Sequence, residues 1–213
     1  MSVEPGLRER KKQQTRQAIA ETARNLFAGR GFEAVTVADV ARAAEVSEGT
    51  VFNYFPTKED LFYSGMEAFE AELVEAIRER SPGKSVVAAF RRFVLERSGR
   101  LAAEEVAEVI ATAGRIINAS PALQAREREI VAHYTGALAE LIAEETGRGA
   151  DDVEARAVAN ALMGTQRALV DHVRAKVLAG RRGPQLARGM RAQAKRAFDR
   201  LERGLADYAI KPR

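Results

Sequence analysis

The chain has 213 residues, no cysteine, two histidines and a net charge of +4. Because there is no cysteine, disulfide frameworks and thiolate metal sites are excluded, and we expect no metal site of any kind. No apolar run approaches the roughly 18 residues that a membrane span requires, and the first residues lack a signal-peptide apolar segment. We therefore expect a cytoplasmic protein that does not enter a membrane.

The first predicted helix runs from about Lys11 to Ala28 and ends at the glycines of residues 29–31, which supply positive φ. Basic residues cluster before it and in its first turns. They are Arg8, Arg10, Lys11, Lys12 and Arg16. Such a basic arm either contacts the phosphates or the minor groove of DNA, or is a solvated tail.

Two short predicted helices follow, on either side of a tight turn. Thr36 is the N-cap candidate of the first helix, and Glu45–Val46 forms the turn. Ser47 is the N-cap candidate of the second helix, which ends at Phe55 because a proline follows. Two capped helices around a tight turn form a helix-turn-helix, which places its second helix in the major groove of DNA.

The next helix is predicted as one continuous element from Lys58 to about Arg80, with Thr57 as its N-cap. Five further helices are predicted from apolar stripes bounded by glycine or proline. They cover about residues 85–97, 102–118, 121–146, 152–178 and 184–208. No segment alternates as a strand does. The predicted fold class is all-α, with about nine helices.

The helix-turn-helix region carries a dense pattern of small, apolar and capping residues over about residues 12–62. The pattern is Gly31-Phe32, Thr36-Val37, Val40-Ala41, Ala44, Val46-Ser47, Gly49-Thr50-Val51, Tyr54-Phe55, Lys58-Glu59 and Leu61. It resembles the N-terminal domain of the TetR family of transcriptional regulators. The resemblance implies a DNA-binding domain at residues 1–57 and an effector-binding and dimerisation domain at residues 58–213.

The resemblance further implies a ligand-released repressor that binds a palindromic operator as a dimer. A transcriptional activator, or an architectural DNA-binding protein without an effector, remains the alternative. No cofactor is implied beyond a small apolar or amphipathic effector. The last two long helices would pair with those of a second copy. Their candidate stripes are Val158, Ala161, Leu162, Thr165, Leu169 and Val173, and Met190, Ala194, Ala197, Phe198 and Leu201, which could equally pack within one chain.

The resemblance also assigns DNA contacts. Phosphates would be bound by Thr36, Tyr54 and Lys58, while Ser47, Gly49 and Thr50 would lie near the backbone and base edges. Asn53 would reach bases, since an amide suits the paired donor and acceptor of adenine.

One departure concerns charge, because residues 47–55 contain no Lys or Arg and include Glu48. Glu48 either accepts from a cytosine amino group or is a solvated residue. Phosphate attraction must then come from Lys58, Arg42 and the N-terminal arm.

The resemblance also implies an effector pocket among the middle helices, and composition alone nominates its residues. Its candidate apolar residues are Phe90, Phe93, Ile110, Ile116 and Ile117, and its candidate polar residues are Arg115, Asn118, His133, Tyr134 and Gln166. Pockets of this kind combine apolar walls with a few polar groups. Each residue could instead be ordinary core or surface.

An enzyme receives little support from the sequence. The chain contains no Gly-x-Ser-x-Gly, no phosphate-binding loop and no His-Glu-x-x-His, so we expect no catalytic residues. Residues 174–213 hold twelve Lys or Arg against three Asp or Glu, which predicts either a solvated helix surface or a second anion-binding surface.

Overall fold

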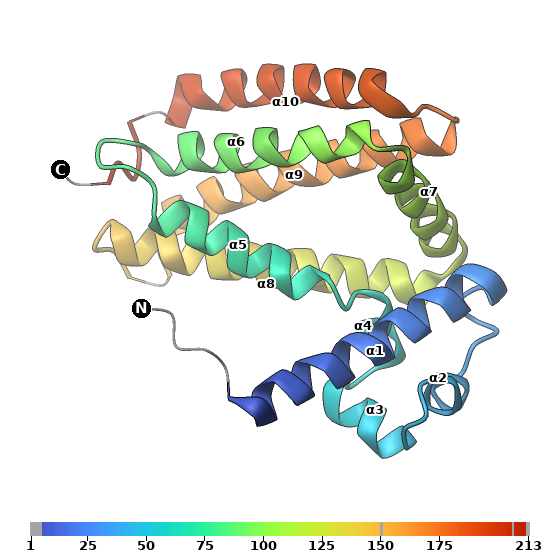
Figure 1. The fold of residues 1–213 in the computed structure, drawn as a ribbon. Coiled ribbons are helices and arrows are strands. Elements are labelled where there is room, and N and C mark those ends of the chain that lie inside the picture. The colour runs from blue at the N-terminus through green and yellow to red at the C-terminus, as the bar shows by residue number, and fades with distance from the viewer. Residues whose placement is uncertain (1–5, 150, 206, 212–213) are drawn as a thin grey trace. The chain divides into compact units, whose positions relative to one another are not determined.

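The computed structural model describes residues 6–149, 151–205 and 207–211 (Figure 1). These residues form α-helices joined by short loops, one 3₁₀ turn, and a single isolated β-bridge between Ser85 and Ile210. The all-α prediction is confirmed. Within the described residues, every helix is too short or too polar to span a bilayer.

The described residues divide into two compact units. The N-terminal unit contains the described residues up to Met66 together with Ile116–Arg126, and the body contains Glu67–Arg115 and the described residues from Glu127 onward. The helices of the N-terminal unit are α1 (Leu7–Arg30), α2 (Val37–Ala43), α3 (Glu48–Tyr54) and α4 (Lys58–Phe62). The other elements are α5 (Met66–Arg78), α6 (Val86–Arg97), η1 (Ser98–Ala102), α7 (Glu104–Ala119), α8 (Pro121–Glu145), α9 (Val153–Leu178) and α10 (Gly183–Leu205).

The N-terminal unit has an apolar core, to which the helices α1 to α4 and the loops between them contribute residues. Its fully buried residues include Ile19, Ala23, Phe27, Phe32, Val35, Val40, Val51, Phe55 and Leu61. Helix α1 is longer than predicted, because its first turns, from Leu7, are exposed and polar and so carry no apolar stripe. The expected basic arm is therefore helical in its described part.

The continuous helix predicted from Lys58 to Arg80 is wrong. Helix α4 ends at Phe62, and α5 begins at Met66 after a turn in which the Met66 N–H donates to the Tyr63 carbonyl. The buried Tyr63 side chain donates from its hydroxyl to the carbonyl of Leu123 at 3.0 Å. This tertiary hydrogen bond holds the turn, and a helical pattern in the sequence cannot reveal it.

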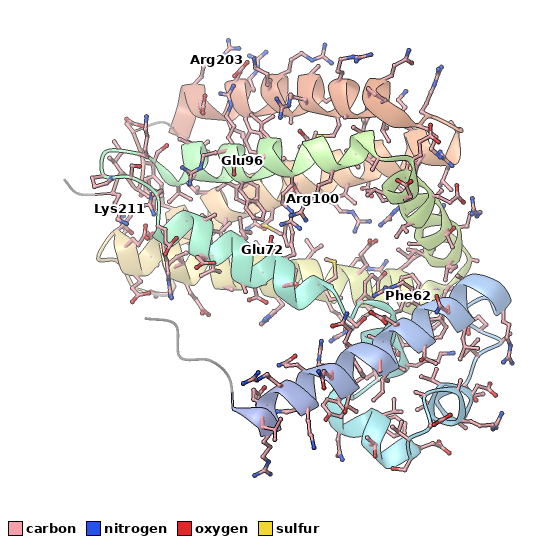
Figure 2. The ribbon with its side chains drawn as sticks, viewed as in Figure 1. Phe62, Glu72, Glu96, Arg100, Arg203 and Lys211 are labelled. Carbon is pink, nitrogen blue, oxygen red and sulfur yellow. The ribbon has the colours of Figure 1, made fainter. Side chains whose placement is uncertain are left out.

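In the body, α10 packs against α6, η1 and α9 (Figure 1). Val109 on α7 is a large apolar residue that is 60 % exposed. Most of the stripes proposed for dimerisation are buried within the body itself. These buried residues are Val158, Leu162, Leu169, Val173, Met190, Ala194 and Phe198. The outer side of α10 is basic instead, and Figure 2 shows Arg203 on the side that faces away from α6.

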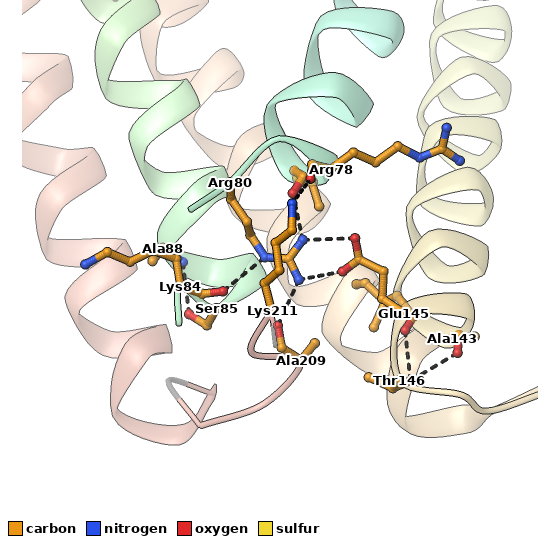
Figure 3. Close-up of polar contacts among 12 residues, drawn as sticks. Arg78, Arg80, Lys84, Ser85, Ala88, Ala143, Glu145, Thr146, Ala209 and Lys211 are labelled. Carbon is orange, nitrogen blue, oxygen red and sulfur yellow. Dashed lines mark hydrogen bonds and ion pairs between the residues drawn. The ribbon is translucent and has the colours of Figure 1, made fainter. Parts of the chain in front are cut away.

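One buried arginine joins four segments of the body (Figure 3). Arg80 is 2 % exposed, and its guanidinium donates to both carboxylate oxygens of Glu145. It also donates to the carbonyls of Ile77, Lys84 and Ala209. A guanidinium has five N–H donors in a fixed planar arrangement. All of them are used here, so the ends of α5 and α8 are tied to the chain that follows α10.

Candidate nucleic-acid interface

The first helix of the motif is fixed by a complete capping box. The Thr36 hydroxyl accepts from the Asp39 N–H at 3.1 Å, and the Thr36 N–H donates to the Asp39 carboxylate at 3.0 Å. These two bonds satisfy free amides at the start of α2. The hydrogen bonds from Thr36, helped by Arg30 and Arg42, lower the pKa of Asp39. Asp39 therefore stays charged at neutral pH.

The turn between α2 and α3 lies where the sequence predicts it. Glu45 adopts a φ of 55°, a left-handed conformation that a non-glycine residue adopts only occasionally. The Val46 N–H donates to the Ala41 carbonyl at 3.0 Å, which closes the turn. The backbone then leaves this turn directly into the cap of α3.

Helix α3 begins at a cap formed by two hydroxyl residues. The Ser47 hydroxyl accepts from the Thr50 N–H at 3.0 Å, and the two hydroxyl oxygens lie 2.8 Å apart. Val51 of α3 and Phe55 at its C-cap are buried. The helix is therefore held on one side only, and its opposite side is available for a partner.

The free side of α3 presents a short, uncharged surface with one acidic end. Glu48, Gly49 and Asn53 are exposed, while Thr50 and Tyr54 are half-buried. Glu48 stands in the first turn, where the helix dipole favours a negative charge. The sequence prediction missed Phe52, which is 47 % exposed beside Asn53. The helical period could have revealed it, because Val51 and Phe55 form the buried stripe and Phe52 falls outside that stripe.

The cations predicted to bind phosphate differ in how free they are. The Lys58 ammonium donates to the carbonyls of Phe32 and Val35 at 3.0 and 3.2 Å and lies over the Phe32 ring. Arg42 is exposed and forms an ion pair with Asp39 at 3.2 Å. On α1, the Arg16 guanidinium lies 4.8 Å from the Phe55 ring centroid. The cationic part of α1 therefore reaches the end of α3.

In the body, the predicted effector residues fall into several groups. Phe90, Phe93 and Tyr134 are buried, and the Phe69 ring lies 5.5 Å from Phe93 and 6.1 Å from Tyr134. The Arg97 guanidinium lies over Phe69 and Phe93, which the sequence did not reveal. The structure thus brings two of the predicted residues into one aromatic cluster.

Other predicted effector residues lie elsewhere. Arg115 is exposed and bonded to Glu108, whose pKa is lowered by hydrogen bonds from Arg115 and Arg182. His133 is exposed, 3.5 Å from Glu70. The buried Ile117, the half-buried Ile116 and the exposed Asn118 belong to the N-terminal unit, whereas the half-buried Ile110 and Gln166 belong to the body.

Comparison with known proteins agrees with this architecture. Residues 19–64 match the family described as "Bacterial regulatory proteins, tetR family", and residues 84–206 match the "MftR C-terminal domain". The regulator TcmR of Streptomyces glaucescens is 32 % identical over 153 residues, which are 70 % of this chain and 67 % of TcmR. MftR of Mycobacterium tuberculosis is 26 % identical over 170 residues, which are 76 % of this chain and 81 % of MftR.

Solved structures show the same fold. NalD of Pseudomonas aeruginosa, the secondary repressor of the MexAB-OprM multidrug efflux pump, superimposes with a TM-score of 0.53 at 20 % identity. The match covers 93 % of this chain and 98 % of NalD. FadR of Bacillus subtilis in complex with stearoyl-CoA gives 0.53 at 22 % identity, over 89 % and 98 % of the two chains. With a capped helix-turn-helix at residues 36–55 and family matches over both parts, the chain belongs to the tetR family of helix-turn-helix transcriptional regulators.

Proposed function

We propose that this regulator represses transcription by binding a palindromic operator as a homodimer, and that a small molecule bound in the body releases it. Because its proposed partner is chromosomal DNA, we place its action in the cytoplasm. The observation that carries the DNA half of this proposal is the exposed polar side of α3 above the buried Val51 and Phe55. A helix held in this way inserts its free side into the major groove.

Base contacts come from the exposed residues of α3. Asn53 offers a donor and an acceptor to adenine, and the exposed ring of Phe52 offers an apolar contact to a thymine methyl group. Ser47, Gly49 and Thr50 lie at the N-terminal end of α3, close to the DNA backbone, and Glu48 reads a cytosine amino group or faces water. These contacts supply sequence preference but little attraction, because α3 has no cation.

Phosphate contacts come from residues around α3. Thr36 and Tyr54 supply hydroxyl groups, while Arg42, Lys58 and the cationic residues of α1 supply positive charge. Lys58 stands at the N-terminus of α4, where free amides also favour an anion. Its carbonyl contacts hold the ammonium at that position, which supports a role in register as well as attraction.

Dimerisation uses the side of α9 opposite its buried stripe. That side consists mostly of small residues, which let two helices approach closely. They are Ala157, Ala161, Gly164, Ala168 and Ala175. Dimers of helix-turn-helix proteins place two recognition helices about one helical turn of DNA apart, roughly 34 Å.

The effector proposal rests on the aromatic cluster and the polar residues within the body. Phe93 and Tyr134 gather with Phe69, while Gln166 lies on the inward side of α9. The effector of this chain is expected to be apolar or amphipathic. The FadR structure, whose complex contains stearoyl-CoA, is one case of this fold with an amphipathic ligand. Binding must favour a form with weaker DNA affinity, since only differential affinity shifts an equilibrium.

The test is selection of genomic DNA fragments by the purified protein at moderate salt, followed by sequencing. Enrichment of one palindrome, bound as two copies per site, is the expected result. Equal binding of most sequences with a steep salt slope would instead identify an architectural DNA-binding protein. Reporter expression in cells then separates the two modes of regulation: deletion of the regulator should raise expression from the operator, whereas a fall would identify an activator.

A further inference from the structure

The inward side of α9 is left uncovered near its middle. Residues seven apart on a helix lie on nearly the same side, so Met163, Val170 and Val177 should be covered alike. Met163 is 3 % exposed and Val177 is 1 % exposed, but Val170 between them is 37 % exposed. The body therefore covers both ends of this stripe and leaves the Val170 side chain partly exposed between them.

Gln166 lies on α9 one turn before Val170. It lies on the buried stripe of α9, between Leu162 and Leu169, which are 0 % and 4 % exposed. Its carboxamide oxygen is buried and accepts no hydrogen bond within the described part of the chain. A buried amide oxygen without a donor is destabilising, and such groups are rare in folded proteins. Gln166 is therefore poorly explained as a structural residue.

The charged side chains next to Gln166 neutralise one another. Glu127 of α8 accepts from Arg174 at 3.3 Å and lies 2.9 Å from the Arg167 guanidinium. Arg167 also donates to Asp171 at 3.0 Å. Burial raises the pKa of Glu127, but Arg174 and Arg167 lower it by more, so the carboxylate is charged at neutral pH. The two cations and two anions of this cluster balance, so the cluster itself offers an ionic ligand no unmatched charge.

We propose that Gln166 recognises the effector, and that the effector is an uncharged, largely apolar molecule whose hydroxyl or amide N–H donates to the Gln166 carboxamide oxygen. This inference rests on the proposed effector response of the body. The apolar part of the molecule covers Val170, and its donor supplies the missing partner of Gln166. A charged ligand would lose its hydration without gaining a counter-charge.

The first test needs no ligand. Gln166→Met replaces the carboxamide by an apolar chain of similar length, which removes an unsatisfied polar group. The thermal midpoint of the full-length protein should rise, because an apolar replacement is favoured where the amide has no partner. Gln185→Met is the matched control, since Gln185 is exposed on α10 and its change should leave the midpoint unaltered. A lower midpoint for Gln166→Met would show that the carboxamide is satisfied internally and would overturn the proposal.

The second test uses three probes with the same apolar chain: 1-decanol, decanoate and decylammonium. Calorimetric titration of the wild-type protein should give at least tenfold tighter binding of 1-decanol than of either ion. The Gln166→Met protein should bind 1-decanol about tenfold more weakly than the wild type. Equal binding of an ion, unchanged binding of 1-decanol by Gln166→Met, or no binding of 1-decanol would each overturn the proposal.

A separate measurement distinguishes this inference from the proposed function. The wild-type protein on its selected operator is screened against a chemically diverse library for release of DNA. If an anionic or cationic compound releases it and 1-decanol does not bind, the effector response stands and the role of Gln166 falls. If no compound releases it, the effector part of the proposed function itself is contradicted.

Discussion

The ammonium of Lys58 lies 4.1 Å from the centroid of the Phe32 ring and donates to the backbone carbonyl of the same residue at 3.0 Å. A second bond, to the carbonyl of Val35, measures 3.2 Å. One lysine thus ties the start of α4 to the loop between α1 and α2. An ammonium has three N–H donors, and these two carbonyls use two of them.

Lys58→Met should therefore have two separable effects. Loss of the charge-assisted bonds should cost about 2 kcal/mol of stability, measured as a lower urea midpoint. Loss of a phosphate contact should flatten the dependence of log affinity on log salt by about one unit. Lys84→Met, at an exposed lysine of the body, should change neither. If the urea midpoint falls but the slope of log affinity against log salt stays at the wild-type value, Lys58 stabilises the fold and does not contact a phosphate.

Asn53→Ala tests base recognition by α3. The variant should lose roughly 1–3 kcal/mol of binding on the selected operator, mainly through relaxed preference at one base pair. Gln185→Ala is the control, because that residue is exposed on α10. Affinities are measured for the operator and its single-base variants. Equal weakening on all of them would show that Asn53 does not read a base.

The capping box of α2 predicts a pH dependence. The pKa of Asp39 is lowered in the folded state, so the carboxylate stabilises the fold above its unfolded pKa of about 3.9, and this contribution is lost as pH falls through the lower folded value. Asp39→Ala should be less stable than the wild type at pH 7 and at pH 5. The difference should shrink at pH 3 and below. Urea unfolding at these three values checks it, and a constant difference would contradict the role of the charge.

Arg80 predicts a large loss of stability. Arg80→Met removes the guanidinium donors of the Glu145 carboxylate, which is 24 % exposed, and of the Ala209 carbonyl, while the carbonyls of Ile77 and Lys84 keep a backbone donor each. The loss should be about 3 kcal/mol, since removal of one partner of a buried pair leaves the other unmatched. Arg203→Met, at an exposed arginine of α10, should stay within about 0.5 kcal/mol of the wild type. Chemical unfolding of the body, followed by circular dichroism, measures both.

Gly164 offers a selective test of dimerisation. A Cβ atom built on Gly164 meets nothing within 4 Å in the single chain, so Gly164→Glu should fold normally. If α9 pairs with a second copy, the variant places two like charges at the contact and should shift the protein to monomers. Gly136→Glu on α8, also open at Cβ, is the control. Analytical ultracentrifugation measures the oligomeric state. If the Gly164→Glu protein is still a dimer, the interface does not include this side of α9.

Local signals predicted the N-terminal helices well. The caps at Thr36, Ser47 and Thr57 are each made by the hydroxyl that the sequence nominates. The three bonds span only three residues, so neighbouring sequence determines them. The end of α4 was missed for the opposite reason, because the Tyr63 hydroxyl finds its partner sixty residues away.

The candidate site was less predictable in the body. Whether Val158 or Ala157 faces a second copy depends on which side of α9 the rest of the chain covers, and both sides are apolar or small. Pairs such as Glu127 and Arg174 join residues that lie 47 positions apart in the sequence. A single sequence carries no signal for such pairs, whereas the motif residues lie on one short segment.

The Arg80 arrangement has an evolutionary consequence. Three of the acceptors of Arg80 are backbone carbonyls, which every residue type has. The side chains at positions 77, 84 and 209 can therefore be substituted during evolution without loss of these hydrogen bonds. Only Glu145 supplies a side-chain acceptor, so positions 80 and 145 should change together in divergent descendants, with charge lost or exchanged at both. Lysine at position 80 should be rare among them, since it has fewer donors and lacks the planar geometry that reaches all four segments.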